Sequence, residues 1–162
     1  MSGYHLAQFN VATLKRPLES PESAPFREAL DHINALAEAQ AGFVWRATGQ
    51  GFDSAEPTAG QDPLYIVNLS VWESAEALAA FAYRTEHREY VRRRGEWFEP
   101  REGPSFVLWW IPAGEIPTGA EGERRLAGLA ADGPGAHAFD FRTRIAPPDL
   151  ELAVKSAYGA AP

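Results

Sequence analysis

The sequence contains no cysteine and a single methionine among 162 residues. Without cysteine the protein cannot form disulfide bonds, thiolate nucleophiles, zinc ribbons or iron–sulfur clusters. Its 15 basic and 22 acidic residues give a net charge of −7, so it lacks the basic excess that binding to nucleic acid or an anionic membrane requires. There is no apolar run of the roughly 18–20 residues that span a bilayer, nor the layout of a secretion signal. We therefore expect a cytoplasmic protein without nucleic-acid or membrane partners.

Hydrophobic residues make up 45% of the chain and aromatic residues 12%, which suffices for one domain with a substantial core. Alternating or β-prone stretches predict strands, and apolar residues recurring every three to four positions predict helices. In chain order these are a strand at 4–14, a helix at 26–41, strands at 43–47 and 64–72, a helix that begins after Ser74, and a strand at 106–111. The charged continuation of the later helix, residues 85–95, is expected to form a kinked second segment.

This β-α-β-β-α-β order predicts an α+β, ferredoxin-like sheet over residues 1–114, with both helices on one face. Residues 115–145 are expected to extend the same domain with a helix, since Thr118 and Glu121 have the spacing of a capping box, and with a possible edge strand near Phe139. Residues 49–63 are rich in turn-forming types, which predicts a surface loop. Residues 146–162 are expected to be a weakly ordered tail.

The two faces of the predicted sheet differ in chemistry, because alternate residues of a strand point to opposite sides. We expect the helices to cover the face that carries mostly Val, Leu and Phe, such as Phe9 and Val67. The other face combines aromatic rings with carboxamides, and it is too apolar for water and too polar for an ordinary core. We predict that a second copy of the chain covers it, giving a homodimer with a small-molecule cavity. Alternatively, these polar side chains only satisfy one another in a cavity without function.

The candidate substrate-binding residues are the aromatic and polar side chains of that face. Trp72, Phe106 and Trp110 are expected to hold a planar, apolar molecule, while the carboxamides bind its carbonyl or hydroxyl groups. On the second strand, either Trp45 or Arg46 points into the cavity, and Arg46 would suit a carboxylate or phenolate. The full predicted set is Gln8, Asn10, Trp45, Arg46, Asn68, Ser70, Trp72, Phe106 and Trp110.

Among the four histidines no pair has metal-ligand spacing, and we expect no metal site. His87 is the candidate catalytic residue, because it lies where the later helix changes register and can move a proton near neutral pH; a surface histidine is the alternative. The arginine run that starts at Arg84 and ends at Arg94 is expected to be a solvated face. It could instead form a dimer-rim ion network or clamp an anionic substrate. Dinucleotide, phosphate-binding and nucleophile-elbow motifs are absent.

Four stretches resemble a bacterial domain-of-unknown-function family, number 3291: YHLAQFN at 4–10, GFVWR at 42–46, FAYRTEHR at 81–88 and RRGEWF at 93–98. The resemblance covers residues 4–145. That family is similar to the dimeric α/β-barrel superfamily, which includes antibiotic-biosynthesis monooxygenases without cofactors, isomerases and haem proteins. The resemblance implies paired ferredoxin-like subunits, with a ligand between sheet and helices or in the cavity of the sheet.

Three functions are consistent with these observations. The first is a cofactor-independent oxygenase, isomerase or cyclase acting on a planar, apolar metabolite, with His87 moving a proton. The second is a haem protein with His87 as the axial ligand. The third is a binding or structural homodimer without catalytic activity. The first requires no cofactor, and haem is the only cofactor among the alternatives.

Overall fold

The computed structural model describes residues 3–48 and 64–148 of the chain. Within these residues the chain forms four strands and five α-helices, with a short 3-10 turn before the first helix. In chain order they are β1 (Tyr4–Thr13), α1 (Ala24–Ala39), β2 (Phe43–Arg46), β3 (Tyr65–Trp72), α2 (Ala75–Ala82), α3 (Thr85–Arg92), α4 (Arg94–Trp97), β4 (Phe106–Pro112) and α5 (Gly119–Asp132).

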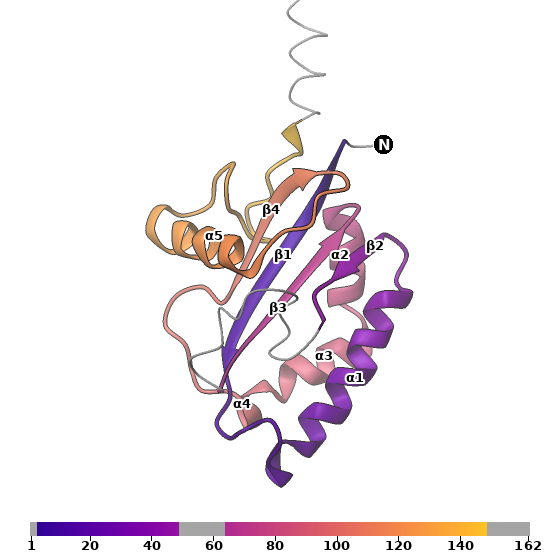
Figure 1. Ribbon diagram of the computed structural model, residues 1–162, viewed down its shortest axis with the longest axis vertical. Coiled ribbons are helices and arrows are strands. Elements are labelled where there is room, and N and C mark those ends of the chain that lie inside the picture. Colours follow the sequence, from indigo (N-terminus) through magenta and orange to yellow (C-terminus); the bar gives the residue numbers. More distant parts are fainter. Residues whose placement is uncertain (1–2, 49–63, 149–162) are drawn as a thin grey trace, which may run out of the picture.

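The strands form one antiparallel sheet in the order β2-β3-β1-β4, with β3 and β1 as the two central strands (Figure 1). Its two long pairings are continuous: Leu6 is opposite Trp72 on β3 and opposite Trp110 on β4. The predicted α+β, ferredoxin-like fold is therefore confirmed. Within residues 3–48 and 64–148, no helix combines the length and apolar character that crossing a membrane requires.

Local signals in the sequence determine where the helices begin and end. Ser74 accepts a hydrogen bond from the backbone N of Ala77 at 3.1 Å and so caps α2. Gly42 has φ +88°, and a Cβ at this position would lie 2.5 Å from the Cβ of Ala77, so both the turn and the close approach of α2 require glycine. The predicted kink is also present, because α2 ends at Ala82 and α3 starts at Thr85.

The helices cover the sheet differently from our expectation. Helices α1 and α2 pack on the face of Leu6, Trp72 and Leu108, the face that also carries the carboxamides. The opposite face, with Phe9 and Val67, packs against α5 (Figure 1). The prediction that the carboxamide face is left for a second subunit is therefore wrong.

The physical reason is that each face carries a full set of large apolar side chains. Trp72 and Leu108 bury fully against the helices on one side, while α5 provides Leu126 and Leu129 for the other. Both faces are thus buried within one chain. Homodimerisation stays a prediction.

The segment after α5 returns to the free edge of β4. Leu108 and Phe139 exchange backbone hydrogen bonds of 2.8 and 2.9 Å, which form a single bridge where we predicted a possible strand. The Trp110 indole Nε1 donates to the carbonyl oxygen of Ile145 at 2.8 Å. The ring of Phe141 stacks on that of Phe106, with the ring centres 5.3 Å apart. The segment after α5 therefore places the aromatic ring of Phe141 beside the sheet.

The predicted loop at 49–63 and the tail beyond residue 148 lie outside the described residues.

Candidate functional site: a cleft between the sheet and the helices

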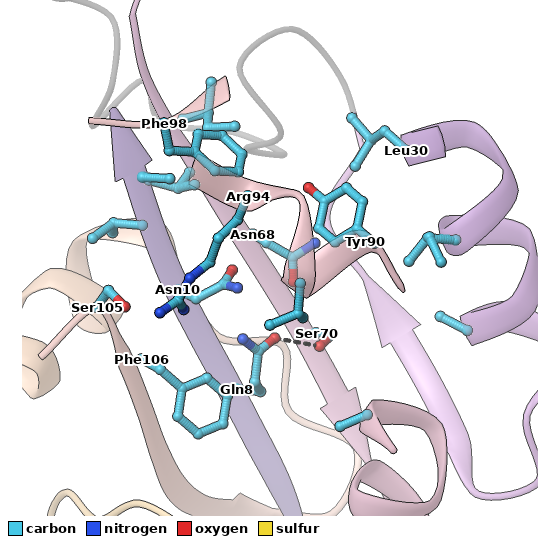
Figure 2. A pocket seen from close by; sticks show the side chains of 18 of the residues that line it. Gln8, Asn10, Leu30, Asn68, Ser70, Tyr90, Arg94, Phe98, Ser105 and Phe106 are labelled. Atoms are coloured by element: carbon cyan, nitrogen blue, oxygen red, sulfur yellow. Dashed lines mark hydrogen bonds between the residues drawn. The ribbon is translucent and has the colours of Figure 1, made fainter. Parts of the chain in front are cut away.

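A cleft of about 820 Å³ lies between the sheet and the helices that cover it (Figure 2). This volume lies within the range of small-molecule sites in proteins. Strands β1 and β3 supply the floor, and α1, α2 and α3 supply most of one wall. Helix α4, the segment that connects it to β4, and Phe106 at the start of β4 complete the opposite end together with Phe141. The cleft is formed by the described residues of a single chain.

The floor carries three carboxamides and a hydroxyl because the register of β1 and β3 places polar residues opposite each other. Gln8 is paired with Ser70, and Asn10 with Asn68. The Trp72 indole Nε1 donates to Ser70 Oγ at 2.9 Å, and Ser70 Oγ in turn donates to Gln8 Oε1 at 2.8 Å. Since the Gln8 oxygen is engaged by Ser70, the nitrogen of the same amide is directed away from Ser70, as Figure 2 shows.

Asn10 and Asn68 are half-buried at the floor. Within the described part of the chain, neither side chain forms a hydrogen bond to another protein group. A carboxamide left without a partner in an apolar environment costs about 1–3 kcal/mol. These two amides, with the Gln8 nitrogen, therefore provide hydrogen-bond donors and acceptors for a molecule bound in the cleft.

The walls of the cleft are mainly aromatic. Burial raises the pKa of the Tyr90 phenol further above the physiological range. Phe98 contacts Phe26 edge-to-face, with the ring centres 5.1 Å apart. The aromatic residues that line the cleft are Phe26, Phe43, Trp72, Phe81, Tyr90, Phe98, Phe106 and Phe141. Such walls are suited to a flat, apolar body.

Among the described residues that line the cleft, most of the charged side chains are basic. Arg46 is paired with Glu38, with 2.6 Å between Nε and Oε1. Lys15 Nζ donates to the Gly95 carbonyl oxygen at 2.8 Å, and Arg101 Nε donates to the Pro104 carbonyl oxygen at 3.2 Å. The lining contains four basic residues and one acidic residue, namely Lys15, Arg46, Arg94, Arg101 and Glu99.

The structure brings together seven of the nine predicted binding residues. Those that line the cleft are Gln8, Asn10, Arg46, Asn68, Ser70, Trp72 and Phe106. Trp45 does not line it, because a bulge between Phe43 and Trp45 places Trp45 opposite Val71 and against the cluster on the α5 face. Trp110 does not line it either: its indole Nε1 donates to Ile145 and its ring packs against Phe139. The open question about β2 is thus answered in favour of Arg46.

His87 lies in α3, and its side chain is outside the described part of the chain, so its predicted role stays a prediction. None of the other three histidines lines the cleft. In the described residues, no group of three or more His, Asp or Glu side chains is arranged to hold a metal ion.

Tyr90, Phe98 and Phe141 also line the cleft but were not among the predicted site residues, and Arg94 was included only through the alternative that the arginine run binds an anionic substrate. Tyr90 and Arg94 are four positions apart, which is the spacing of one helical face, and this signal could have indicated a shared direction. Phe141 carries no such signal, because its position depends on how the segment after α5 returns to β4.

Residues 5–155 of the chain match the family described as "Domain of unknown function (DUF3291)". Among curated proteins, none matches the sequence significantly. Similar solved structures include SnoaB, a cofactor-independent oxygenase from Streptomyces nogalater: identity is 14%, the TM-score is 0.46, and the match covers 69% of this chain and 95% of SnoaB.

Two further solved structures show the same degree of likeness. Rv0793 from Mycobacterium tuberculosis has 16% identity and a TM-score of 0.48, covering 70% of this chain and 99% of Rv0793. A provisionally assigned antibiotic biosynthesis monooxygenase from Nitrosomonas europaea has 13% identity and a TM-score of 0.47, covering 74% and 97% respectively. At such identities no activity is transferred from these proteins to this chain.

Proposed function

We infer that this chain, which belongs to the DUF3291 family as its motifs predicted, binds a planar, mostly apolar small molecule in the cleft. The observation that carries the proposal is the floor of the cleft. Asn10 on β1 and Asn68 on the neighbouring strand β3 are directly opposite each other. Their side chains have no partners among the described residues, and the cleft around them is lined by aromatic rings. Polar groups placed in this way usually serve a ligand or bound water. Carboxamides both donate and accept hydrogen bonds, which suits carbonyl and hydroxyl groups of the ligand.

We further propose that the bound molecule reacts without a cofactor, in a reaction of the oxygenase, isomerase or cyclase type. Hydrogen bonds from the floor amides would withdraw electron density from a ligand carbonyl, which makes a neighbouring C–H group more acidic. A histidine is well suited to accept that proton near neutral pH. His87 occupies the turn of α3 that precedes Tyr90, a residue of the cleft wall.

Titration with anthraquinone-2-carboxamide tests the binding proposal. This probe is planar, uncharged and carries two ring carbonyls, and Trp72 in the wall of the cleft provides a fluorescence signal. We expect saturable quenching by the probe. The substitutions Asn10→Leu and Asn68→Leu should each weaken binding about three- to ten-fold, as expected for the loss of one hydrogen bond.

Thr13→Val is the matched control, because Thr13 lies on the same strand as Asn10 but is not among the residues that line the cleft. It should change the affinity for the probe by less than about two-fold, which corresponds to less free energy than one hydrogen bond contributes. The absence of saturable quenching, or equal weakening by all three substitutions, would contradict the proposal. A Soret band that forms on haem addition and is lost in His87→Ala would support the haem alternative instead.

A further inference from the structure

We propose that the ligand is an aromatic carboxylate and that Arg94 binds its carboxylate group at the α4 end of the cleft. This rests on the proposed function, because it names the class of molecule that the cleft binds. Arg94 is the first residue of α4, and it lines the cleft. Figure 2 shows its side chain extending from the helix toward Asn10 on the floor.

Arg94 differs from its neighbours because its side chain has no partner among the described residues. Arg92 is paired with Glu89 and Arg93 with Glu96, in both cases with 2.7 Å between nitrogen and oxygen. The Arg94 side chain forms no hydrogen bond or ion pair within residues 3–48 and 64–148. An arginine keeps its positive charge throughout the physiological pH range. Arg94 is thus an exposed cation at the edge of the cleft that no acidic side chain of the described residues neutralises.

The surrounding charges favour an anion at the same place. The whole chain has a net charge of −7, yet the described lining contains four basic residues and one acidic residue. Lys15 lies at the same end as Arg94, since its ammonium group bonds the carbonyl of Gly95. Glu99 is exposed, as are Lys15, Arg94 and Arg101, so the basic residues outnumber it at the rim of the cleft. Clefts lined by charges of one sign concentrate the field of those charges and attract ligands of the opposite sign.

The helix that carries Arg94 is fixed relative to the floor. The backbone N of Lys15 donates to the Trp97 carbonyl, and the backbone N of Glu99 donates to the Thr13 carbonyl, both at 2.8 Å. The Trp97 ring is buried beside Phe26, with the ring centres 5.5 Å apart. These contacts tie the C-terminal end of α4 to the end of β1, the strand that carries Asn10. The backbone that carries Arg94 is therefore held close to the strand that carries Asn10, which reduces the entropy lost when a ligand binds.

A carboxylate group fits this arrangement. The guanidinium group presents two parallel N–H donors at the spacing of the two carboxylate oxygens. The Asn10 amide can donate a further hydrogen bond to the same group. An aromatic body extending from it would meet the ring of Phe106, whose position is supported by the stacked ring of Phe141. The geometry thus favours a flat molecule with one anionic end.

The test compares anthraquinone-2-carboxylate with anthraquinone-2-carboxamide, which have nearly the same shape and differ in charge. We expect the unsubstituted protein to bind the carboxylate about ten-fold more tightly at pH 7, as expected for a charge-assisted hydrogen bond. Arg94→Gln should abolish this preference by weakening the binding of the carboxylate probe only. Arg94→Lys should retain part of the preference. Arg92→Gln is the matched control, because Arg92 is a neighbouring, exposed arginine outside the lining, and it should change neither affinity.

The outcomes separate the two proposals. If both probes bind with equal affinity, or if Arg94→Gln weakens both to the same extent, the carboxylate inference is wrong while the binding function stands. If neither probe binds, the proposed function fails, and the inference fails with it. Loss of the preference in Arg92→Gln as well would mean that general surface charge, rather than Arg94, attracts the anion, and this too would overturn the inference.

Discussion

Ser70 links two strands and the cleft wall through a single hydroxyl group. It accepts a hydrogen bond from the Trp72 indole and donates one to the Gln8 carboxamide, and all three residues are buried. Because the hydroxyl determines which end of the Gln8 amide faces the cleft, it also orients a donor that a ligand could use. The stability of the fold and the chemistry of the floor thus depend on the same side chain.

Replacing Ser70 by alanine should lower the free energy of unfolding by about 1–3 kcal/mol, because the indole N–H and the Gln8 oxygen would both lose their buried partner. Urea unfolding followed by tryptophan fluorescence measures this change. Ser105→Ala is the matched control: Ser105 also lines the cleft, and its side chain forms no hydrogen bond within the described residues. It should change stability by less than about 0.5 kcal/mol. Equal effects of the two substitutions would show that the network does not stabilise the fold.

At the scale of elements, the sequence predicted the strands and helix starts, because these depend on local signals. Ser74 and Thr118 both cap the helices that follow them, as expected from their spacing. Which face each helix covers depends on long-range packing instead. Both sides of the sheet are apolar enough to be covered, so alternation along β3 could not distinguish the face of Val67 from that of Trp72. The assignment therefore failed although the elements were correctly predicted.

The contact between α5 and the sheet depends on one glycine. A Cβ on Gly122 would lie 2.5 Å from the ring of Phe9, whereas a Cβ on Gly128 of the same helix would meet nothing within 4 Å. Gly122→Ala should therefore destabilise the protein by about 1–3 kcal/mol through overpacking, despite the better helix propensity of alanine. Gly128→Ala should stabilise it by up to about 1 kcal/mol. Thermal unfolding measures both, and a gain in stability from Gly122→Ala would show that α5 does not pack closely on Phe9.

At the scale of the molecule, the sequence predicted the floor of the site but not its ends. Strand alternation alone places Gln8, Asn10 and Asn68 on one face, so these residues could be identified together. Arg94 and Phe141 come from a short helix and from the segment after α5, and only tertiary contacts bring them to the cleft. Side chains supplied by such connecting segments are the part of a site that periodicity cannot predict.

Because the cleft lies within one chain, we expect ligand binding to be independent of the association of two chains. Our prediction of a homodimer assumed that a second copy closes the site, but the cleft lies between the sheet and the helices of one chain. We therefore expect one anthraquinone-2-carboxylate per chain, with an affinity independent of protein concentration, whether light scattering reports 17.8 kDa or twice that mass. The measurement is a fluorescence titration repeated across the concentration range in which the scattering mass changes. An affinity that weakens as the dimer dissociates would show instead that the partner chain contributes to the site, since association and binding would then be linked.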